Sequence, residues 1–112
     1  MTINISIFTS MTNPEERMDP WKEALNCYED LADEVITVGE NWPQEFSWDY
    51  IGKTFHEGFV KSSGDWVIRM DLDYFFHENH LKRIYDTLRE NSDQPAVAFP
   101  QYQIFTPDRY QV

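Results

Sequence analysis

Cysteine is almost absent from this sequence of 112 residues, which contains only Cys27. A single cysteine excludes an internal disulfide and a cysteine-based zinc site. Residues 1–4 show no basic segment leading into an apolar stretch, as a secretory signal would, and no apolar run approaches the roughly 20 residues that span a bilayer. We therefore expect a soluble protein without a transmembrane segment in a reducing compartment, the cytoplasm.

Basic residues are also scarce, because nine Lys and Arg oppose 20 Asp and Glu and give a formal net charge of -11. This balance argues against nucleic acid or an anionic membrane as a partner, since both attract basic surfaces. A phosphorylated ligand would need a cation to offset the repulsion. The chain is nonetheless 41% hydrophobic and 16% aromatic, so it folds, and its length suits a single domain over residues 1–112.

Several short apolar, mostly β-branched runs are typical of strands. Strands are expected at residues 3–8, 35–38, 66–70 and 96–99, and residues 102–105 either extend the fourth strand or begin a fifth. Gly39 stops the second of them. The predicted strands alternate with three amphipathic segments, which indicates an α/β fold with a mostly parallel sheet flanked by helices.

The three amphipathic segments carry helix signals at their ends. The first begins at Asp19 with Pro20 in the first helical position; a start at Asn13 would leave that proline inside the helix. The second is capped by Ser47 and ends at Gly64. The first helix ends near residues 32–33 and the third near residue 91. The expected buried stripes are Met18, Trp21, Leu25, Tyr28 and Leu31; Ile51, Phe55 and Phe59; and Leu81, Ile84, Tyr85 and Leu88.

An acidic pair, Asp71 and Asp73, directly follows the third predicted strand. Residues i and i+2 of a strand point to the same side, so we expect both carboxylates to face one place at the carboxyl edge of the sheet, where ligands of such sheets bind. Two carboxylates suit Mn²⁺ or Mg²⁺, with phosphate oxygens and water completing the shell. Asp-x-Asp alone is a weak motif, and its position after a buried strand makes it informative.

The segments around the acidic pair are Gly52–Phe59, Ser62–Trp66 and Met70–Asp73, which read GKTFHEGF, SSGDW and MDLD. This order of a helix with a basic residue, a glycine, an acidic-aromatic pair, an apolar strand and an acidic pair resembles glycosyltransferase family 2 and its GT-A-fold relatives. The resemblance covers roughly residues 3–90 and is strongest over 52–76.

The resemblance implies a GT-A fold and transfer of a sugar from a nucleoside diphosphate sugar to an unknown acceptor. It places the metal on Asp73, and Asp71 on the nucleotide ribose or the metal shell. It also places the nucleotide against Thr9 and Ser10 after the first strand.

Two further positions match family contacts less closely. Glu40, after the second strand, stands where the family often has an Asp that bonds the base. Lys53 lies near a basic residue that meets the nucleotide, and a solvated helix charge explains it equally well.

The family's catalytic base lies in a second half of the domain, so the resemblance makes this chain an N-terminal, donor-binding part with no assigned catalytic residue. Asp108 is better explained as a turn residue than as that base. A truncated module that binds or assembles without catalysis is the alternative, and self-association into a homo-oligomer would cover its open sheet edge.

The sequence lacks the motifs of several other enzyme classes. The first predicted strand ends at Thr9 and Ser10 rather than at the acidic residues of a receiver domain, and the glycine-rich loops of nucleotidyltransferases, dinucleotide-binding enzymes and P-loop enzymes are missing.

The remaining chemically active or aromatic residues are expected to be structural. His56, His77 and His80 are interpreted as surface or capping residues and Cys27 as a packing residue. Trp42 and Trp48 are expected in the core in preference to a donor pocket.

Overall fold

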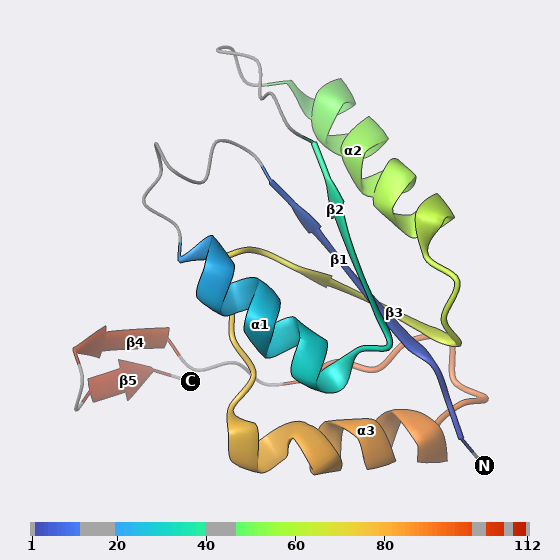
Figure 1. The fold of residues 1–112 in the computed structure, drawn as a ribbon, viewed down its shortest axis with the longest axis vertical. Coiled ribbons are helices and arrows are strands. Elements are labelled where there is room, and N and C mark those ends of the chain that lie inside the picture. The colour runs from blue at the N-terminus through green and yellow to red at the C-terminus, as the bar shows by residue number, and fades with distance from the viewer. Residues whose placement is uncertain (1, 12–19, 40–46, 100–102, 107–108, 112) are drawn as a thin grey trace.

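A computed structural model describes residues 2–11, 20–39, 47–99, 103–106 and 109–111 of the chain. Three strands form a parallel sheet in the order β2-β1-β3. The central strand is β1 (Ile5–Ser10), and its neighbours are β2 (Glu34–Val38) and β3 (Trp66–Met70). In the register, Ile7 lies opposite both Val35 and Ile68. The expected mostly parallel α/β fold is therefore confirmed (Figure 1).

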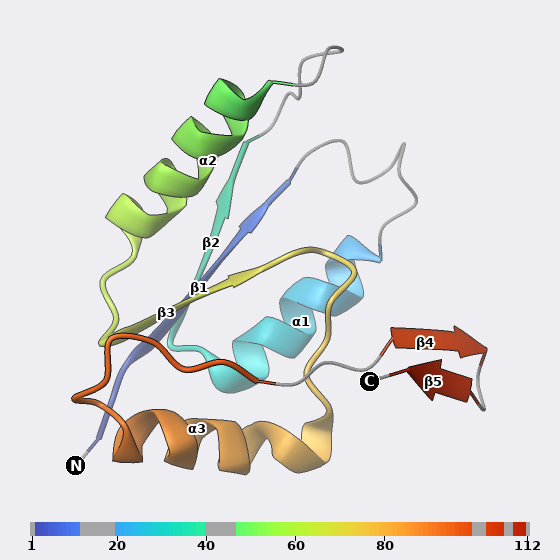
Figure 2. The ribbon, with the colours of Figure 1, turned by 180° about the vertical axis from the view of Figure 1, so that it is seen from behind.

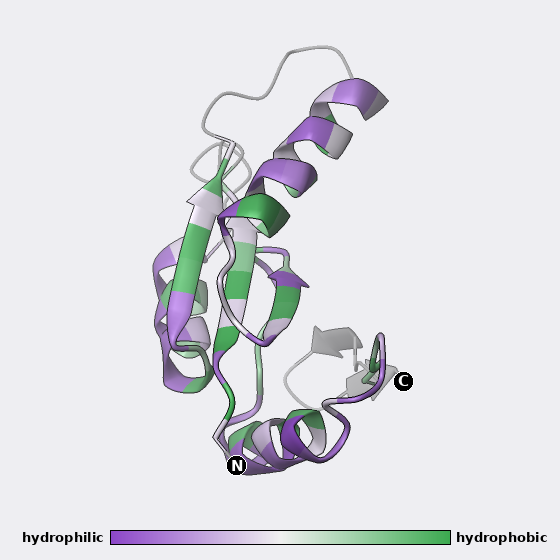
Figure 3. Cartoon of the chain, turned by 90° about the vertical axis from the view of Figure 1, so that its right-hand side faces the viewer, coloured by the Kyte–Doolittle hydropathy of each residue, from purple (hydrophilic) through white to green (hydrophobic). Residues whose placement is uncertain are grey.

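Helices follow the strands in the expected alternation. They are α1 (Trp21–Leu31), α2 (Trp48–Lys61) and α3 (Leu81–Glu90), and a short 3-10 turn, η1 (Glu78–His80), leads into α3. Helices α1 and α3 lie on the same side of the sheet (Figure 2), and α2 lies on the other (Figure 3).

A small antiparallel hairpin forms a second sheet. Its strands are β4 (Gln103–Thr106) and β5 (Arg109–Gln111). Of the two possibilities left open for residues 102–105, a new strand is the one observed, and its partner β5 was not predicted.

The main core lies between β1 and helices α1 and α3. Ile5 and Ile7 of β1 are fully buried and pack with Tyr28 of α1 and Leu88 of α3. The described residues of the predicted α1 stripe belong to this core, to which Ala24 contributes as well, and so does the predicted α3 stripe except for Leu81. Met18 lies outside the described residues. Burying these side chains supplies most of the free energy that holds α1 and α3 on the sheet.

The face of α2 that meets the sheet differs from the predicted one. Thr54 and Gly58 are its buried residues, whereas Phe59 is 61% exposed. The ring of Phe8 on β1 occupies the space beside Gly58 and also packs against Phe55 of the predicted stripe, with ring centroids 6.5 Å apart. The expectation that Phe59 shares a buried stripe is therefore wrong.

The predicted fourth strand at residues 96–99 is also wrong. The segment forms no ladder with the main sheet, and only Val97 packs against the core. Prolines stand on both sides of it, at 95 and 100, and a proline has no N–H to donate to a strand ladder. Strand β3 consequently lies at an edge of the sheet in the part of the chain that is described.

Helix ends agree with the sequence signals in part. The Ser47 hydroxyl accepts a hydrogen bond from Tyr50 N at 3.2 Å and caps α2 as expected. Pro20 is the cap residue of α1, one position later than predicted, and Asp19 lies outside the described residues. Helix α2 ends at Lys61, not at Gly64. Gly39, with a φ of 70°, ends β2 in the left-handed conformation that favours glycine.

Candidate functional site

The acidic pair lies in a tight turn after β3. The strand ends at Met70, and Tyr74 N donates to the Asp71 carbonyl at 2.9 Å, which closes a turn over Leu72 and Asp73. Both Asp71 and Asp73 lie beyond the end of the strand, so the alternation of side chains in a strand does not set the directions of their carboxylates. The backbone of the turn decides where the Asp73 carboxylate lies.

Asp71 pairs with Arg69, a residue of β3. The Arg69 Nη1 atom donates to Asp71 Oδ1 at 2.9 Å, and the guanidinium lies 4.7 Å from the ring centroid of Phe55 on α2. Both charged side chains are more than 40% exposed, so this ion pair contributes little to stability. It leaves Asp71 Oδ2 available to another ligand.

Asp73 is exposed, and no hydrogen bond or ion pair engages its carboxylate within the described part of the chain. No group of three or more His, Cys, Asp or Glu side chains that could hold a metal exists among the described residues. Mg²⁺, however, commonly binds one or two protein carboxylates and completes its shell with water and substrate phosphates. The oxygen donors of Asp73 and Asp71 fit such a site.

Helix α1 contacts the backbone of the acidic turn, which consists of residues 71–74. The buried Tyr28 hydroxyl lies 2.5 Å from the Asp71 carbonyl oxygen and 2.7 Å from that of Tyr74. Burial raises the pKa of Tyr28, and electrostatic interactions with Cys27, Asp71 and Asp73 raise it further.

Cys27 makes the second attachment of this turn to α1. Its Sγ atom accepts from Phe76 N at 3.3 Å and lies 3.4 Å from Phe76 O, to which the thiol donates. Cys27 packs against the core as expected, but no local pattern around it predicts these hydrogen bonds.

Thr9 and Ser10 end β1 at the same edge of the sheet. The register places Thr9 opposite Met70, the residue before Asp71. The hydroxyl oxygens of Thr9 and Ser10 are buried and have no hydrogen-bond partner in the described structure. A buried hydroxyl without a hydrogen-bond partner lowers the stability of the fold by about 1–3 kcal/mol, so two such groups side by side are unusual in a folded domain.

Among the other expected site residues, Lys53 is not joined to the acidic turn. Lys53 is exposed on α2, and no hydrogen bond or ion pair joins it to Asp71 or Asp73 in the described structure. Glu40, Trp42 and Asp108 lie outside the described residues. Trp48 is 76% exposed, so its expected place in the core is wrong.

The three histidines are exposed, as expected. His77 caps η1 through its Nδ1 atom, which accepts from Asn79 N at 3.1 Å.

Comparison with known proteins decides the family. Residues 45–112, more than half of the chain, match the profile of Glycosyl transferase family 2. The chain belongs to this family. No curated protein and no solved structure matches it.

The family match begins later than the resemblance noted in the sequence, which starts at about residue 3. It includes Lys53, Asp71 and Asp73 of this family 2 chain but not Thr9 or Ser10. Within the part of the chain that is described, no helix combines the length and apolar character needed to cross a bilayer.

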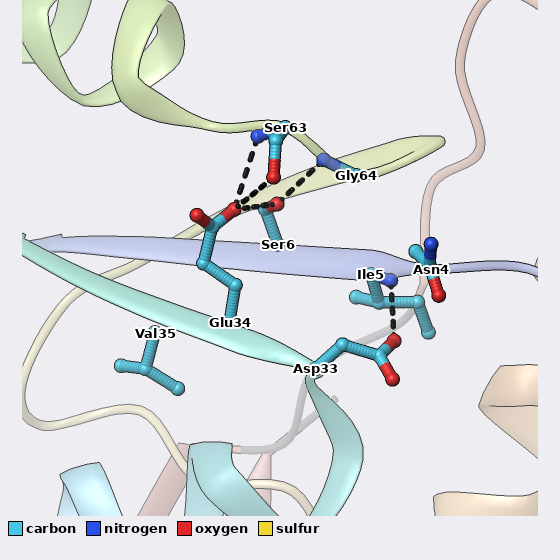
Figure 4. Close-up of a pocket in the computed structure, with 8 residues that line it drawn as sticks. All are labelled: Asn4, Ile5, Ser6, Asp33, Glu34, Val35, Ser63 and Gly64. Carbon is cyan, nitrogen blue, oxygen red and sulfur yellow. Dashed lines mark hydrogen bonds between the residues drawn. The ribbon is translucent and has the colours of Figure 1, made fainter.

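A cavity of about 500 Å³ lies at the opposite, amino edge of the sheet (Figure 4). Glu34 Oε2 accepts from the Ser6 hydroxyl at 2.5 Å and from Ser63 N and Oγ, each at 3.0 Å. Ser6 Oγ in turn accepts from Gly64 N at 2.8 Å. These bonds lower the pKa of Glu34, the Ser6 bond most of all. The cluster joins the loop before β3 to strands β1 and β2, and its role is structural.

We expect Glu34→Gln to destabilise the fold in a pH-dependent way. Because the folded pKa lies below the ordinary 4.5, the carboxylate stabilises the fold above that pH and stops doing so as pH falls through the lowered pKa. Urea denaturation should show a lower free energy of unfolding than in Glu29→Gln, an exposed control on α1 with the same charge change. The gap between the variants should close between about pH 5 and pH 3; a gap that is constant over this range would contradict the prediction.

Proposed function

We propose that this chain binds a nucleoside diphosphate sugar at the carboxyl edge of its sheet, with Mn²⁺ or Mg²⁺ on Asp73 and Asp71, and donates the sugar to an acceptor. Membership of the family supports glycosyl transfer. The exposed, unengaged carboxylate of Asp73 in the turn after β3 is the observation that carries the metal assignment. We place the reaction in the cytoplasm because a single cysteine suits a reducing compartment.

Each residue at this edge has a definite task in the proposal. Asp73 binds the metal, and Asp71 adds its free Oδ2 atom to the metal shell or to the ribose. Thr9 and Ser10, whose buried hydroxyls have no hydrogen-bond partner among the described residues, contact the nucleotide at the end of β1 in the proposal. The bound metal would neutralise the diphosphate and stabilise its departure. Lys53 and Glu40 remain predicted nucleotide contacts, and no residue is assigned as the catalytic base.

Calorimetric titration of UDP and GDP, with and without Mn²⁺, tests the proposal. One nucleotide should bind about tenfold or more tightly with Mn²⁺, because the metal offsets repulsion between diphosphate and acidic turn. Asp73→Asn keeps the side-chain shape and should lose this metal-dependent gain. Asp93→Asn makes the same charge change at an exposed turn after α3 and should keep it.

The alternative is an assembly module that binds no donor. It is favoured by the edge position of β3 and by the exposed Trp48 and Phe59 on α2, since apolar surface of this kind can be covered by association. If the folded wild type bound neither nucleotide, the donor-site proposal would fail and this alternative would be preferred. A solution mass showing only monomer would contradict self-association.

A further inference from the structure

The carbonyl groups at both ends of the acidic turn meet at one buried hydroxyl. Tyr28 is fully buried, and its oxygen lies within 2.7 Å of the carbonyl oxygens of Asp71 and Tyr74. A phenol has one proton, so the two carbonyls share a single donor. The Asp71 carbonyl also accepts the turn's own bond from Tyr74 N. The Tyr28 hydroxyl thus fixes the two ends of the turn relative to each other.

A second attachment holds the chain just beyond the turn. Cys27 Sγ bonds to both the N–H and the carbonyl of Phe76, and the Phe76 ring packs edge-on against Tyr28 with centroids 6.0 Å apart. Tyr28 and Cys27 are adjacent on α1, and the residues to which they bond lie on both sides of Asp73 in the sequence. Residues more than 40 positions apart in the chain are joined here.

The Asp73 side chain has no such attachment of its own in the described structure. Its position therefore depends on the backbone of the turn. A ligand group must be held within about 0.5 Å of its productive position for full effect. A turn that is less well ordered should consequently bind the metal more weakly at Asp73, even where the overall fold is retained.

We propose that Tyr28 is a positioning residue that holds the turn from Asp71 to Tyr74 in the conformation that binds the divalent metal. The metal-binding half of this inference rests on the proposed function. The half that concerns the conformation of the turn does not, because it can be measured on the protein without metal or nucleotide.

Tyr28→Phe tests the inference, since it removes the hydroxyl and keeps the ring in the core. Tyr85→Phe is the matched control. Tyr85 lies on α3, away from the turn, and its hydroxyl accepts a long-range hydrogen bond from Ile3 N at 3.3 Å. Cys27→Ala is a second variant that removes the neighbouring attachment. Thermal unfolding confirms that each variant is folded at the temperature of the assays.

Two readouts distinguish positioning from general stabilisation. Amide hydrogen exchange at Tyr74 and Phe76 should quicken about tenfold in Tyr28→Phe and remain unchanged in Tyr85→Phe. In Cys27→Ala the Phe76 amide should exchange faster. Mn²⁺ should be titrated into each tyrosine variant in the presence of the bound nucleotide. Its affinity should be about tenfold weaker in Tyr28→Phe and unchanged in Tyr85→Phe.

The outcomes separate the two proposals. Unchanged exchange at Tyr74 in folded Tyr28→Phe would overturn the positioning role, whatever the metal does. Faster exchange with unchanged Mn²⁺ affinity would overturn the link from Tyr28 to the metal while leaving the donor site intact. A wild-type protein that binds neither Mn²⁺ nor nucleotide would overturn the proposed function and the metal half of the inference together, and exchange would still decide whether Tyr28 holds the turn.

Discussion

Replacing Gly64 by alanine is expected to lower the free energy of unfolding by about 3 kcal/mol, a large share of the stability of a domain of this size. An added Cβ would lie 2.7 Å from Ser6 N and 2.9 Å from the Asn4 carbonyl oxygen. Both are backbone atoms at the start of the central strand, which cannot move aside as a flexible side chain can. The loop before β3 would have to shift instead.

That shift would also disturb the polar cluster at the amino edge. Gly64 N donates to Ser6 Oγ, which donates to Glu34, so displacement of the glycine leaves several polar groups with poorer partners. Chemical denaturation followed by circular dichroism would measure the loss of stability. Ser63→Ala, next in the chain, removes one side-chain bond to Glu34 and should cost less than about 1 kcal/mol. Equal effects of the two substitutions would contradict the steric explanation.

Replacing Gly58 by alanine is expected to lower the free energy of unfolding by about 2 kcal/mol, although alanine is the better helix former. The added Cβ would lie 2.3 Å from Cδ2 of Phe8 and within 2.9 Å of two other ring atoms. Phe8 is only 5% exposed, so its ring cannot turn away without disturbing the packing between α2 and β1. Overpacking should outweigh the gain of about 1 kcal/mol in helix propensity.

Gly52 provides the matched control for Gly58 in the same helix. No atom lies within 4 Å of the Cβ that Gly52→Ala would add, so propensity alone should act and stability should rise by about 0.5–1 kcal/mol. Urea denaturation of both variants should therefore give changes of opposite sign. Stabilisation by both substitutions would show that the contact of α2 with Phe8 relaxes at little cost.

The candidate site could be predicted from sequence only as far as local patterns reach. The apolar run before Asp71 identified β3, and the alternation of elements predicted that its carboxyl end lies at the edge of the sheet where we propose that the donor binds. Arg69 was missed, although its spacing of two residues from Asp71 in a strand was the available signal. Tyr28 and Cys27 were assigned to packing, because nothing in the residues around them indicates a bond to a segment far along the chain.

The fold shows the same division. Periodicity identified the three strands of the main sheet, the three helices and the Ser47 cap, because these depend on residues a few positions apart. It failed at residues 96–99, where an apolar run lacks a strand partner, and at Phe59, where the position of the sheet chose the buried face of α2.

The sequence by itself determined the α/β alternation, the family and the presence of an acidic pair after a buried strand. Only the tertiary structure decided that the pair lies in a turn held by α1, and that α2 rests on Gly58 and Gly64 fits against β1. The physical reason is that backbone propensity and hydrophobic periodicity act over a few residues. Steric fit and long-range hydrogen bonds depend instead on which segments the folded chain brings into contact.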